Sequence, residues 1–379
     1  MASSSDPGAL ERLETAVTST LALCHQLAAS LDNICKNPSD APKQTTDPNI
    51  IPLDLARDAA TLVRAHSTKL SLLLINEPYT PSAIVDVLKQ LLSGPVLGVA
   101  SAAEACDPSR YTAFFRKELA WRSKRVLVTL AELLGKIPKD GAALSGPGRG
   151  GFAADAKGSL PSTGILWSAC DEVLALVHGG VGSYFVKRVD EWKDTLKDVM
   201  EELKEWSAEE PNDDDDDDDD DEFAHEDNAD VENNAASTQA MVDDLMSPGQ
   251  AIPHDDPRGI RPRLDSSLRR VRLVVLLYQA ISKRRLSRLP HLPLPADTAY
   301  ANVPQRLDEA AGVLGALPDS FSDLAMAFYE MEPAEIDQAA DDCFFAAFAA
   351  GELLNASWDG GQDEFSEWTE KFKAEIKRS

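Results

Sequence analysis

The sequence predicts an all-α fold, in which antiparallel helical bundles form two lobes joined by a disordered acidic linker. Apolar residues recur at steps of three and four in most segments, which is the spacing of one helix face. No run alternates apolar and polar residues as a strand does, and no internal repeat is visible. The hydrophobic content of 43% is sufficient for a folded core.

The first predicted helix carries an apolar stripe made of Leu10, Leu13, Val17, Thr20, Cys24, Leu27, Leu31 and Ile34. Four prolines follow and end this helix. Thr80 and Asp107 each precede a proline, as an N-cap precedes the first helical residue, and Gly94-Pro95 divides the stretch between them. Further helices are therefore expected at residues 53–75, 81–93 and 108–134.

A glycine-rich stretch at residues 139–164 predicts a long loop. Ser162 or Thr163 then caps a helix that is expected to run to about Val177. The next helix has the clearest spacing in the chain, because its apolar residues alternate steps of four and three: Phe185, Val189, Trp192, Leu196, Val199, Leu203 and Trp206.

The charge of the chain is concentrated in one segment. Residues 207–257 hold 20 acidic residues and no Lys or Arg, and Asp213–Asp221 is an unbroken run of nine aspartates. Adjacent like charges repel and aspartate is a poor helix former, so residues 207–260 are predicted to be a disordered linker. This linker separates an N-terminal helical bundle at 1–206 from a C-terminal helical region at 261–379. It acts either as a spacer, as an interaction segment for basic partners, or as a screen over the basic helix that follows.

That basic helix is expected at residues 264–289, followed by a proline-punctuated stretch at 290–318 and by helices at 320–330, 333–356 and 362–377. Residues 258–288 hold ten Lys or Arg and a single acid. The helix also has an apolar side, and we expect a partner protein to dock on Leu268, Val271, Val275 and Tyr278.

The end of the basic helix is predicted to form a nuclear-import patch or a phosphate-binding surface, made of Lys283, Arg284, Arg285 and Arg288. The alternative is a solvated face whose cations pair with acids on neighbouring helices. Direct binding to nucleic acid is disfavoured, because the tethered aspartates would compete for the same arginines.

No catalytic or metal site is predicted. The segment Gly151–Ser159 resembles a phosphate-binding loop, but it lacks a glycine before Lys157 and a strand leading into it. Cys24 and Cys35 lie on one helix roughly 16 Å apart, too far to share an ion. The sequence has no HxxxH, GxSxG or glycine fingerprint, so we expect neither an enzyme nor a cofactor.

Five cysteines without a CxxC pair favour a reduced, intracellular compartment. The N-terminus lacks the features of a secretory signal. No apolar run approaches the length of a membrane span, and no membrane association is expected.

Two segments resemble the cyclin-D-interacting protein family, also described as Id-like helix-loop-helix proteins. "TGILWSACDEV" is similar to the family's Thr-Gly-x-x-Trp-x-x-Cys-Asp segment, through Thr163, Gly164, Trp167, Cys170 and Asp171. "SFSDLAMAFYEMEP" is similar to its Asp-Leu-Ala…Tyr-Pro segment, through Asp323, Leu324, Ala325 and Tyr329. Residues 70–91 are similar to an early helix–proline–helix block, and a mid-chain acidic segment is typical of the family. The chain departs from the family where Glu330-Met331-Glu332 replaces prolines.

The resemblance implies a non-enzymatic helical protein of nucleus and cytoplasm. Such proteins bind D-type cyclins and helix-loop-helix transcription factors, and restrain the cell cycle by sequestering them. Two alternatives of other classes remain: an acidic chaperone or scaffold for basic clients such as histones, acting through Asp213–Asp221, and an enzyme of unfamiliar type.

Overall fold

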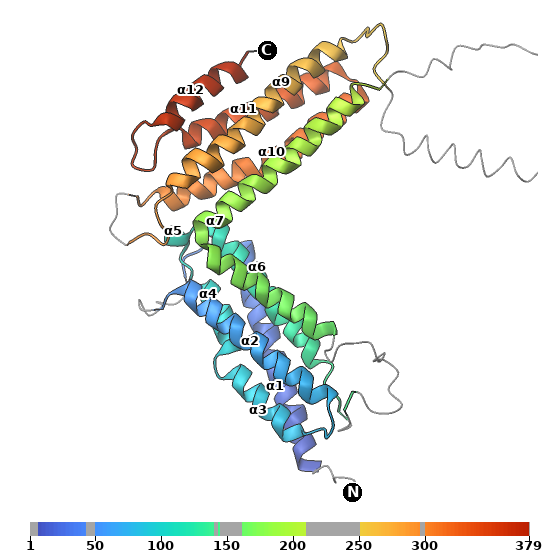
Figure 1. Ribbon diagram of the computed structural model, residues 1–379, viewed down its shortest axis with the longest axis vertical. Coiled ribbons are helices and arrows are strands. Elements are labelled where there is room, and N and C mark those ends of the chain that lie inside the picture. The colour runs from blue at the N-terminus through green and yellow to red at the C-terminus, as the bar shows by residue number, and fades with distance from the viewer. Residues whose placement is uncertain are drawn as a thin grey trace, which may run out of the picture. The chain divides into compact units, whose positions relative to one another are not determined.

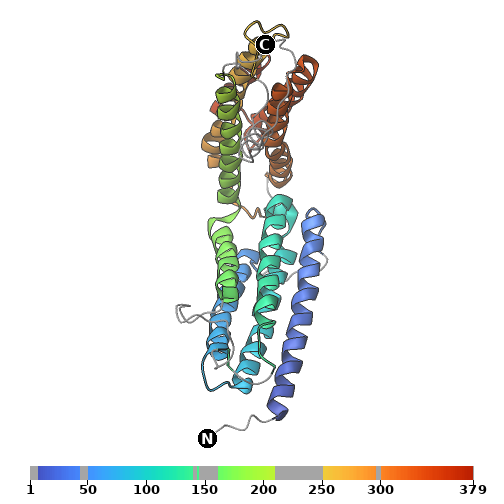
Figure 2. The same ribbon diagram turned by 90° about the vertical axis from the view of Figure 1, so that its right-hand side faces the viewer.

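A computed structural model of the chain describes residues 7–42, 50–139, 143–144, 161–209, 251–295 and 300–378 (Figures 1 and 2). All regular elements within these residues are helices, which confirms the predicted all-α class. They are α1 (Pro7–Lys36), α2 (Pro52–Ile75), α3 (Pro81–Leu92), α4 (Pro95–Ala105), α5 (Pro108–Tyr111), α6 (Ala113–Leu134), α7 (Pro161–Trp206), α9 (Ile260–Ala280), α10 (Val303–Glu330), α11 (Pro333–Asn355) and α12 (Glu364–Ile376).

Proline starts most of these helices, because its fixed φ suits the first turn, where its missing N–H is not needed. The helix predicted at 108–134 is divided into α5 and α6 at Thr112, which has a φ of 88°. The Thr112 side chain accepts a hydrogen bond from the N–H of Phe115 at 3.0 Å and so caps α6. The two helices predicted on either side of residue 180 are joined in α7, with non-helical backbone at Gly180.

The prediction was wrong for residues 303–318, which belong to α10 although they include Pro318. Their apolar residues recur at steps of three and four, as those of the later turns of α10 do. The buried ones are Val303, Leu307, Ala311, Leu314 and Leu317. Because Pro318 has no N–H, the carbonyl of Leu314 loses its helical donor. The Tyr278 hydroxyl donates to that carbonyl instead, at 2.5 Å. Helix α10 therefore continues beyond Pro318, because its apolar residues are buried and the Leu314 carbonyl has a replacement donor.

The chain divides into two compact units, but not at the predicted residues. Unit 1 contains residues 1–186 and 289–309, and unit 2 contains residues 187–288 and 310–379. Both α7 and α10 therefore contribute residues to each unit, whereas the sequence placed the boundary within the acidic linker.

Most of that predicted linker, residues 210–250, lies outside the described residues. Its last ten residues do not fit the prediction of disorder, because they are folded against unit 2. Ile252 is buried, and the Arg261 guanidinium donates to its carbonyl at 3.0 Å.

In unit 1, α1 packs along α6, as Figure 2 shows, and α2 packs on α4. The predicted stripe of α1 faces this core: five of its eight residues are buried, and Leu10, Val17 and Leu27 are partly exposed. The Asp308 carboxylate of α10 caps α6 by accepting the N–H groups of Ala113 and Phe114, each at 2.8 Å. Residues 289–309 thereby complete unit 1.

The seven apolar residues that were predicted to share one face of α7, from Phe185 to Trp206, are all buried. Phe185 belongs to unit 1, and the other six belong to unit 2. Trp206 contacts the rings of Phe328 and Tyr329 of α10, and Phe321 of α10 contacts Phe344 of α11. Helix α12 packs on α11 and α9.

The stretch Pro81–Ala105 is long and apolar enough by composition to cross a membrane, which the search for unbroken apolar runs missed. It is divided into α3 and α4 at Gly94, and half of its most apolar window is buried inside the protein. Both features are those of core helices.

Candidate protein-docking groove

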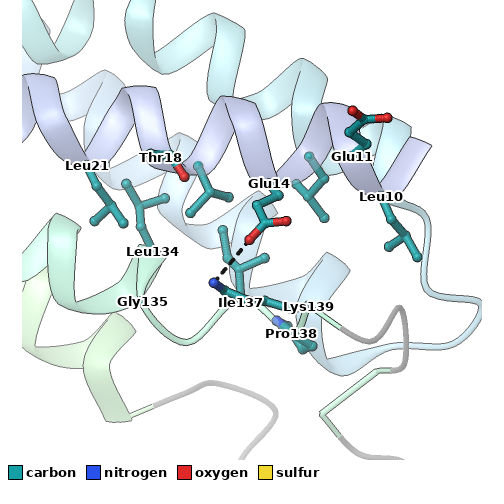
Figure 3. A pocket seen from close by; sticks show the side chains of 12 residues that line it. Leu10, Glu11, Glu14, Thr18, Leu21, Leu134, Gly135, Ile137, Pro138 and Lys139 are labelled. Atoms are coloured by element: carbon teal, nitrogen blue, oxygen red, sulfur yellow. Dashed lines mark hydrogen bonds and ion pairs between the residues drawn. The ribbon is translucent and has the colours of Figure 1, made fainter. Parts of the chain in front are cut away.

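A groove of about 300 Å³ lies between the N-terminal turns of α1 and the end of α6 (Figure 3). The residues that line it come from α1 and from the turn that follows α6: Leu10, Glu11, Leu13, Glu14, Val17, Thr18, Leu21, Leu134, Gly135, Ile137, Pro138 and Lys139. We call this feature the α1 groove.

The α1 groove exists because α1 extends beyond its partner helix. The two helices are antiparallel, since Lys124 pairs with Asp32 and Lys139 pairs with Glu14. Helix α6 ends at Leu134, so on the side of α1 that lines the groove its first turns face the turn at 135–139. The Tyr79 hydroxyl holds that turn by donating to the Pro138 carbonyl at 3.0 Å.

The floor of the α1 groove is buried and its wall is partly exposed. Leu13, Leu134, Ile137 and Pro138 form the floor. Leu10, Val17 and Leu21 are only partly buried and form an apolar wall on α1. In Figure 3 the side chains of Leu10 and Leu21 lie on the side of α1 that faces Leu134 and the turn, whereas the Glu11 carboxylate points away.

One ion pair crosses the α1 groove. The Lys139 ammonium lies 3.2 Å from the Glu14 carboxylate, and the two side chains are 81% and 61% exposed. Exposed pairs of this kind contribute about 0–1 kcal/mol, so a partner can displace it at little cost. Leucine and valine side chains each gain about 1.5–3 kcal/mol on full burial, so the partly exposed wall retains free energy for binding.

The predicted docking residues on α9 are placed differently from what the sequence suggested. Val271 and Tyr278 are buried in unit 2, and Tyr278 repairs the hydrogen bonding of α10 as described above. Leu268 and Val275 are partly exposed, and Leu276 beside them is 44% exposed. The apolar side of α9 is therefore divided between the core and a smaller surface.

The predicted basic patch is also divided. Lys283, Arg284 and Arg288 are exposed, but Arg285 is completely buried and forms an ion pair with Asp363 at 2.9 Å. Arg284 and Arg288 lie near acids of the same region, at 3.4 Å from Glu364 and 3.3 Å from Asp363. The alternative of cations paired with acids on neighbouring segments thus describes three of the four residues.

The first segment of the family resemblance holds α7 against α2. Asp171 pairs with Arg64 at 3.2 Å, and the Arg64 guanidinium lies over the Trp167 ring at 5.8 Å. Thr163 and Cys170 are buried, and burial raises the pKa of the Cys170 thiol to about 12. Gly164 is exposed and has open space where a Cβ would stand. These residues form a packing contact within unit 1.

The second segment holds α10 against the far end of α7, within unit 2. Leu324 is buried and Asp323 is exposed. The Tyr329 hydroxyl donates to Glu202 at 2.9 Å, and burial raises its pKa. Both segments therefore fix α7, one near each of its ends.

The groups that carry chemistry are not gathered in the described part of the chain. No three His, Cys, Asp or Glu side chains are close enough there to hold a metal ion. Burial raises the pKa of Cys24 to about 11 and that of Cys343 to about 12, so these thiols stay protonated at neutral pH and are poor nucleophiles.

The sequence placed Leu10, Leu13 and Val17 on the apolar stripe of a helix but did not identify the α1 groove. One signal was present, because Leu21 widens the apolar stripe near the start of α1. The position at which α6 ends relative to α1 depends on tertiary packing, which the spacing of residues in α1 does not contain.

An all-helical bundle with an apolar groove presents a surface on which a partner helix can pack. Residues 56–209 match the family model described as Grap2 and cyclin-D-interacting, N-terminal, which confirms the resemblance to that family over this segment. The matched residues include α6 and the Thr163–Asp171 segment but not α1.

A curated relative is an uncharacterized protein of the fission yeast Schizosaccharomyces pombe. It is 25% identical over 191 residues, which is 48% of this chain and 54% of the relative. The chain thus matches about half the length of that relative.

Proposed function

We propose that the protein is a non-enzymatic regulator that sequesters a cyclin-like or helix-loop-helix partner and so restrains the cell cycle or transcription. The similarity of residues 56–209 to a cyclin-D-interacting family supports the kind of partner. The apolar α1 groove supports the mode of binding, and it is the single observation on which the proposal depends. The proposal places the protein in both nucleus and cytoplasm, where such partners act.

The dimensions of the α1 groove suit a partner helix. Residues 10–21 of α1 extend over about 17 Å, which is about three helical turns. Leu10, Val17 and Leu21 lie along this length, so an amphipathic helix with apolar residues at steps of three and four can bury them. The surface of Leu268, Val275 and Leu276 on α9 is a second, smaller place where the same kind of contact is proposed.

To test this, a purified D-type cyclin is titrated with the parent chain and with its Leu10→Asp and Val17→Asp variants. Calorimetry measures the dissociation constant of each complex. Each variant places a charge in the apolar wall, so the dissociation constant is expected to rise by about tenfold or more. Both side chains are partly exposed, so the free energy of unfolding is expected to change by less than about 2 kcal/mol.

The matched control is Leu62→Asp, which places the same charge on a leucine of α2 that is 47% exposed and does not line the α1 groove. It is expected to leave cyclin affinity unchanged. Equal affinities for all three variants would exclude the α1 groove, and loss of binding in a folded Leu268→Asp with Val275→Asp double variant would move the site to α9.

The acidic-chaperone alternative depends on Asp213–Asp221, which lie outside the described residues. Replacing the nine aspartates by Gly and Ser is expected to leave cyclin binding unchanged. Salt-sensitive binding of histones that disappears with this replacement would favour the alternative instead.

A further inference from the structure

The end of α9 carries an unused sequence motif. The helix continues as a π-helix (Ile281–Arg285) and a single 3₁₀ turn (Leu286–Arg288), with the sequence Lys-Arg-Arg-Leu-Ser-Arg from residue 283. Ser287 is exposed, and its hydroxyl donates to the Arg284 carbonyl at 3.1 Å.

Arginines three and two residues before a serine form the charge pattern that arginine-directed protein kinases recognise, since their acidic pockets bind the two guanidinium groups. Here those arginines are Arg284 and Arg285. We propose that Ser287 is a phosphorylation site for an arginine-directed kinase, and that docking of α12 on Arg285 controls access to it.

The contacts of Arg285 form what we call the α12 clamp. Its guanidinium donates to both carboxylate oxygens of Asp363, at 2.9 and 3.0 Å, and to the Asn355 carbonyl at 2.8 Å. The Phe365 ring lies 4.5 Å from the guanidinium, and the Trp358 indole donates to the Arg285 carbonyl at 2.9 Å. Asp363 is also the N-cap of α12, so the same carboxylate fixes both the arginine and the helix.

The α12 clamp hides half of the recognition motif. A kinase binds the residues around its acceptor in an extended form, and it needs both arginine side chains. Arg284 and Ser287 are exposed, but Arg285 is completely buried and Leu286 is 6% exposed. The 3₁₀ turn has poorer hydrogen-bond geometry than an α-helix, and the proposal requires that it and the π-helix unwind once the clamp is released.

The reaction uses ATP as the phosphoryl donor. The Ser287 hydroxyl oxygen attacks the γ-phosphorus, and an O–P bond forms while the bond from that phosphorus to ADP breaks. The hydroxyl proton passes to the catalytic carboxylate of the kinase, and ADP leaves.

The product phosphate changes the local charges. The phosphate adds a charge of about −1.5 to −2 at pH 7, next to the cations Lys283, Arg284 and Arg288. In the unphosphorylated chain, the Arg288 guanidinium lies 3.3 Å from the Asp363 carboxylate and the Arg284 guanidinium lies 3.4 Å from the Glu364 carboxylate. The phosphate therefore competes with these two carboxylates for the arginines. Phosphorylation thus neutralises the exposed basic residues beside the clamp.

The experiment incubates the full chain with ATP and the catalytic subunit of cyclic-AMP-dependent kinase, and measures phosphate at residue 287 by mass spectrometry. A synthetic peptide of residues 282–290 serves as the open substrate and is expected to react rapidly. The full chain is expected to react at least about tenfold more slowly. Asp363→Asn, which weakens the clamp, is expected to restore about tenfold or more of the rate, and Ser287→Ala is expected to abolish it.

Two controls separate clamp release from unfolding. Glu364→Gln removes only the exposed pair with Arg284 and is expected to leave the rate unchanged. Ser266 also follows an arginine by three residues, so a rise in phosphate at Ser266 reports general unfolding. If Asp363→Asn unfolds the chain, Trp358→Phe tests the clamp in a second way, because it removes the indole donor to the Arg285 carbonyl and keeps an aromatic ring at that position.

A peptide that is not phosphorylated would overturn the assignment of Ser287. A full chain that reacts as fast as the peptide, or clamp variants that react no faster than the parent chain, would overturn the control by α12.

Discussion

Tyr278 shows at the residue scale how one side chain can be mistaken for a contact residue. Its position on the apolar side of α9 suggested a docking surface, but its hydroxyl donates to the Leu314 carbonyl that Pro318 leaves without a helical donor. The sequence contained both residues. It did not contain the pairing of α9 with α10, so the purpose of the hydroxyl could not be predicted.

We expect Tyr278→Phe to lower the free energy of unfolding by about 1–3 kcal/mol, because a buried carbonyl loses its donor. In a Pro318→Ala background the helix supplies its own N–H, so the same substitution is expected to have a much smaller effect. Urea unfolding of the four proteins measures this coupling. Equal effects of Tyr278→Phe in both backgrounds would disprove the proposed repair.

Asp363 gives the chain a predicted dependence on pH. Burial alone would raise its pKa, but hydrogen bonds from the Ser366 N–H and from Arg285 hold it below the ordinary value of 3.8. A lowered pKa in the folded state stabilises the fold above the ordinary value, and this contribution is lost as the pH falls through the folded-state pKa.

The difference in unfolding free energy between the parent chain and Asp363→Asn is therefore expected to be constant at neutral pH and to shrink below about pH 4. Denaturant titrations at several pH values between about 3 and 7 measure it. A difference that is the same at every pH would show that the carboxylate charge does not stabilise the clamp.

At the scale of single elements, α7 was predicted well, including the break between its two helical segments. Its apolar spacing correctly identified the buried face from Val189 to Trp206, because spacing depends only on local geometry. The non-helical backbone at Gly180, with φ 67° and ψ −174°, lies between the two predicted helices, the first of which was expected to end near Val177. Only the neighbouring elements determine that the helix changes direction there.

Two glycines of α7 are expected to respond oppositely to alanine. Gly180→Ala should destabilise the chain by about 1–3 kcal/mol, because its backbone conformation is accessible essentially to glycine alone. Gly164→Ala should stabilise it by about 0.4–1 kcal/mol, because a Cβ there meets no atom and the unfolded chain loses entropy. Thermal unfolding compares the two, and destabilisation by Gly164→Ala would show that this glycine has a packing role.

At the scale of the whole molecule, the sequence predicted two lobes but placed their boundary in the acidic run. Composition marks where a chain cannot fold, and it marked residues 207–260. It does not show which folded segments pack together. Residues 187–206 precede the acidic run yet belong to unit 2, and residues 289–309 follow it yet belong to unit 1.

A chain cleaved within Asp213–Asp221 is therefore expected to remain a single complex that elutes at the size of the intact protein. A fragment ending at Trp206, expressed alone, should aggregate, because Leu196, Leu203 and Trp206 lose the unit 2 residues that bury them. Size-exclusion chromatography tests both. Separation of the cleaved halves into two folded monomers would contradict the division into these units.

The cap that Asp308 places on α6 has a consequence for biosynthesis. The N–H groups of Ala113 and Phe114 leave the ribosome almost two hundred residues before the carboxylate that receives them. The nascent N-terminal helices must therefore wait, incomplete, while the whole acidic run and α9 are translated. Until Asp308 is made, the start of α6 has Thr112 as its cap and water as the acceptor for these two N–H groups.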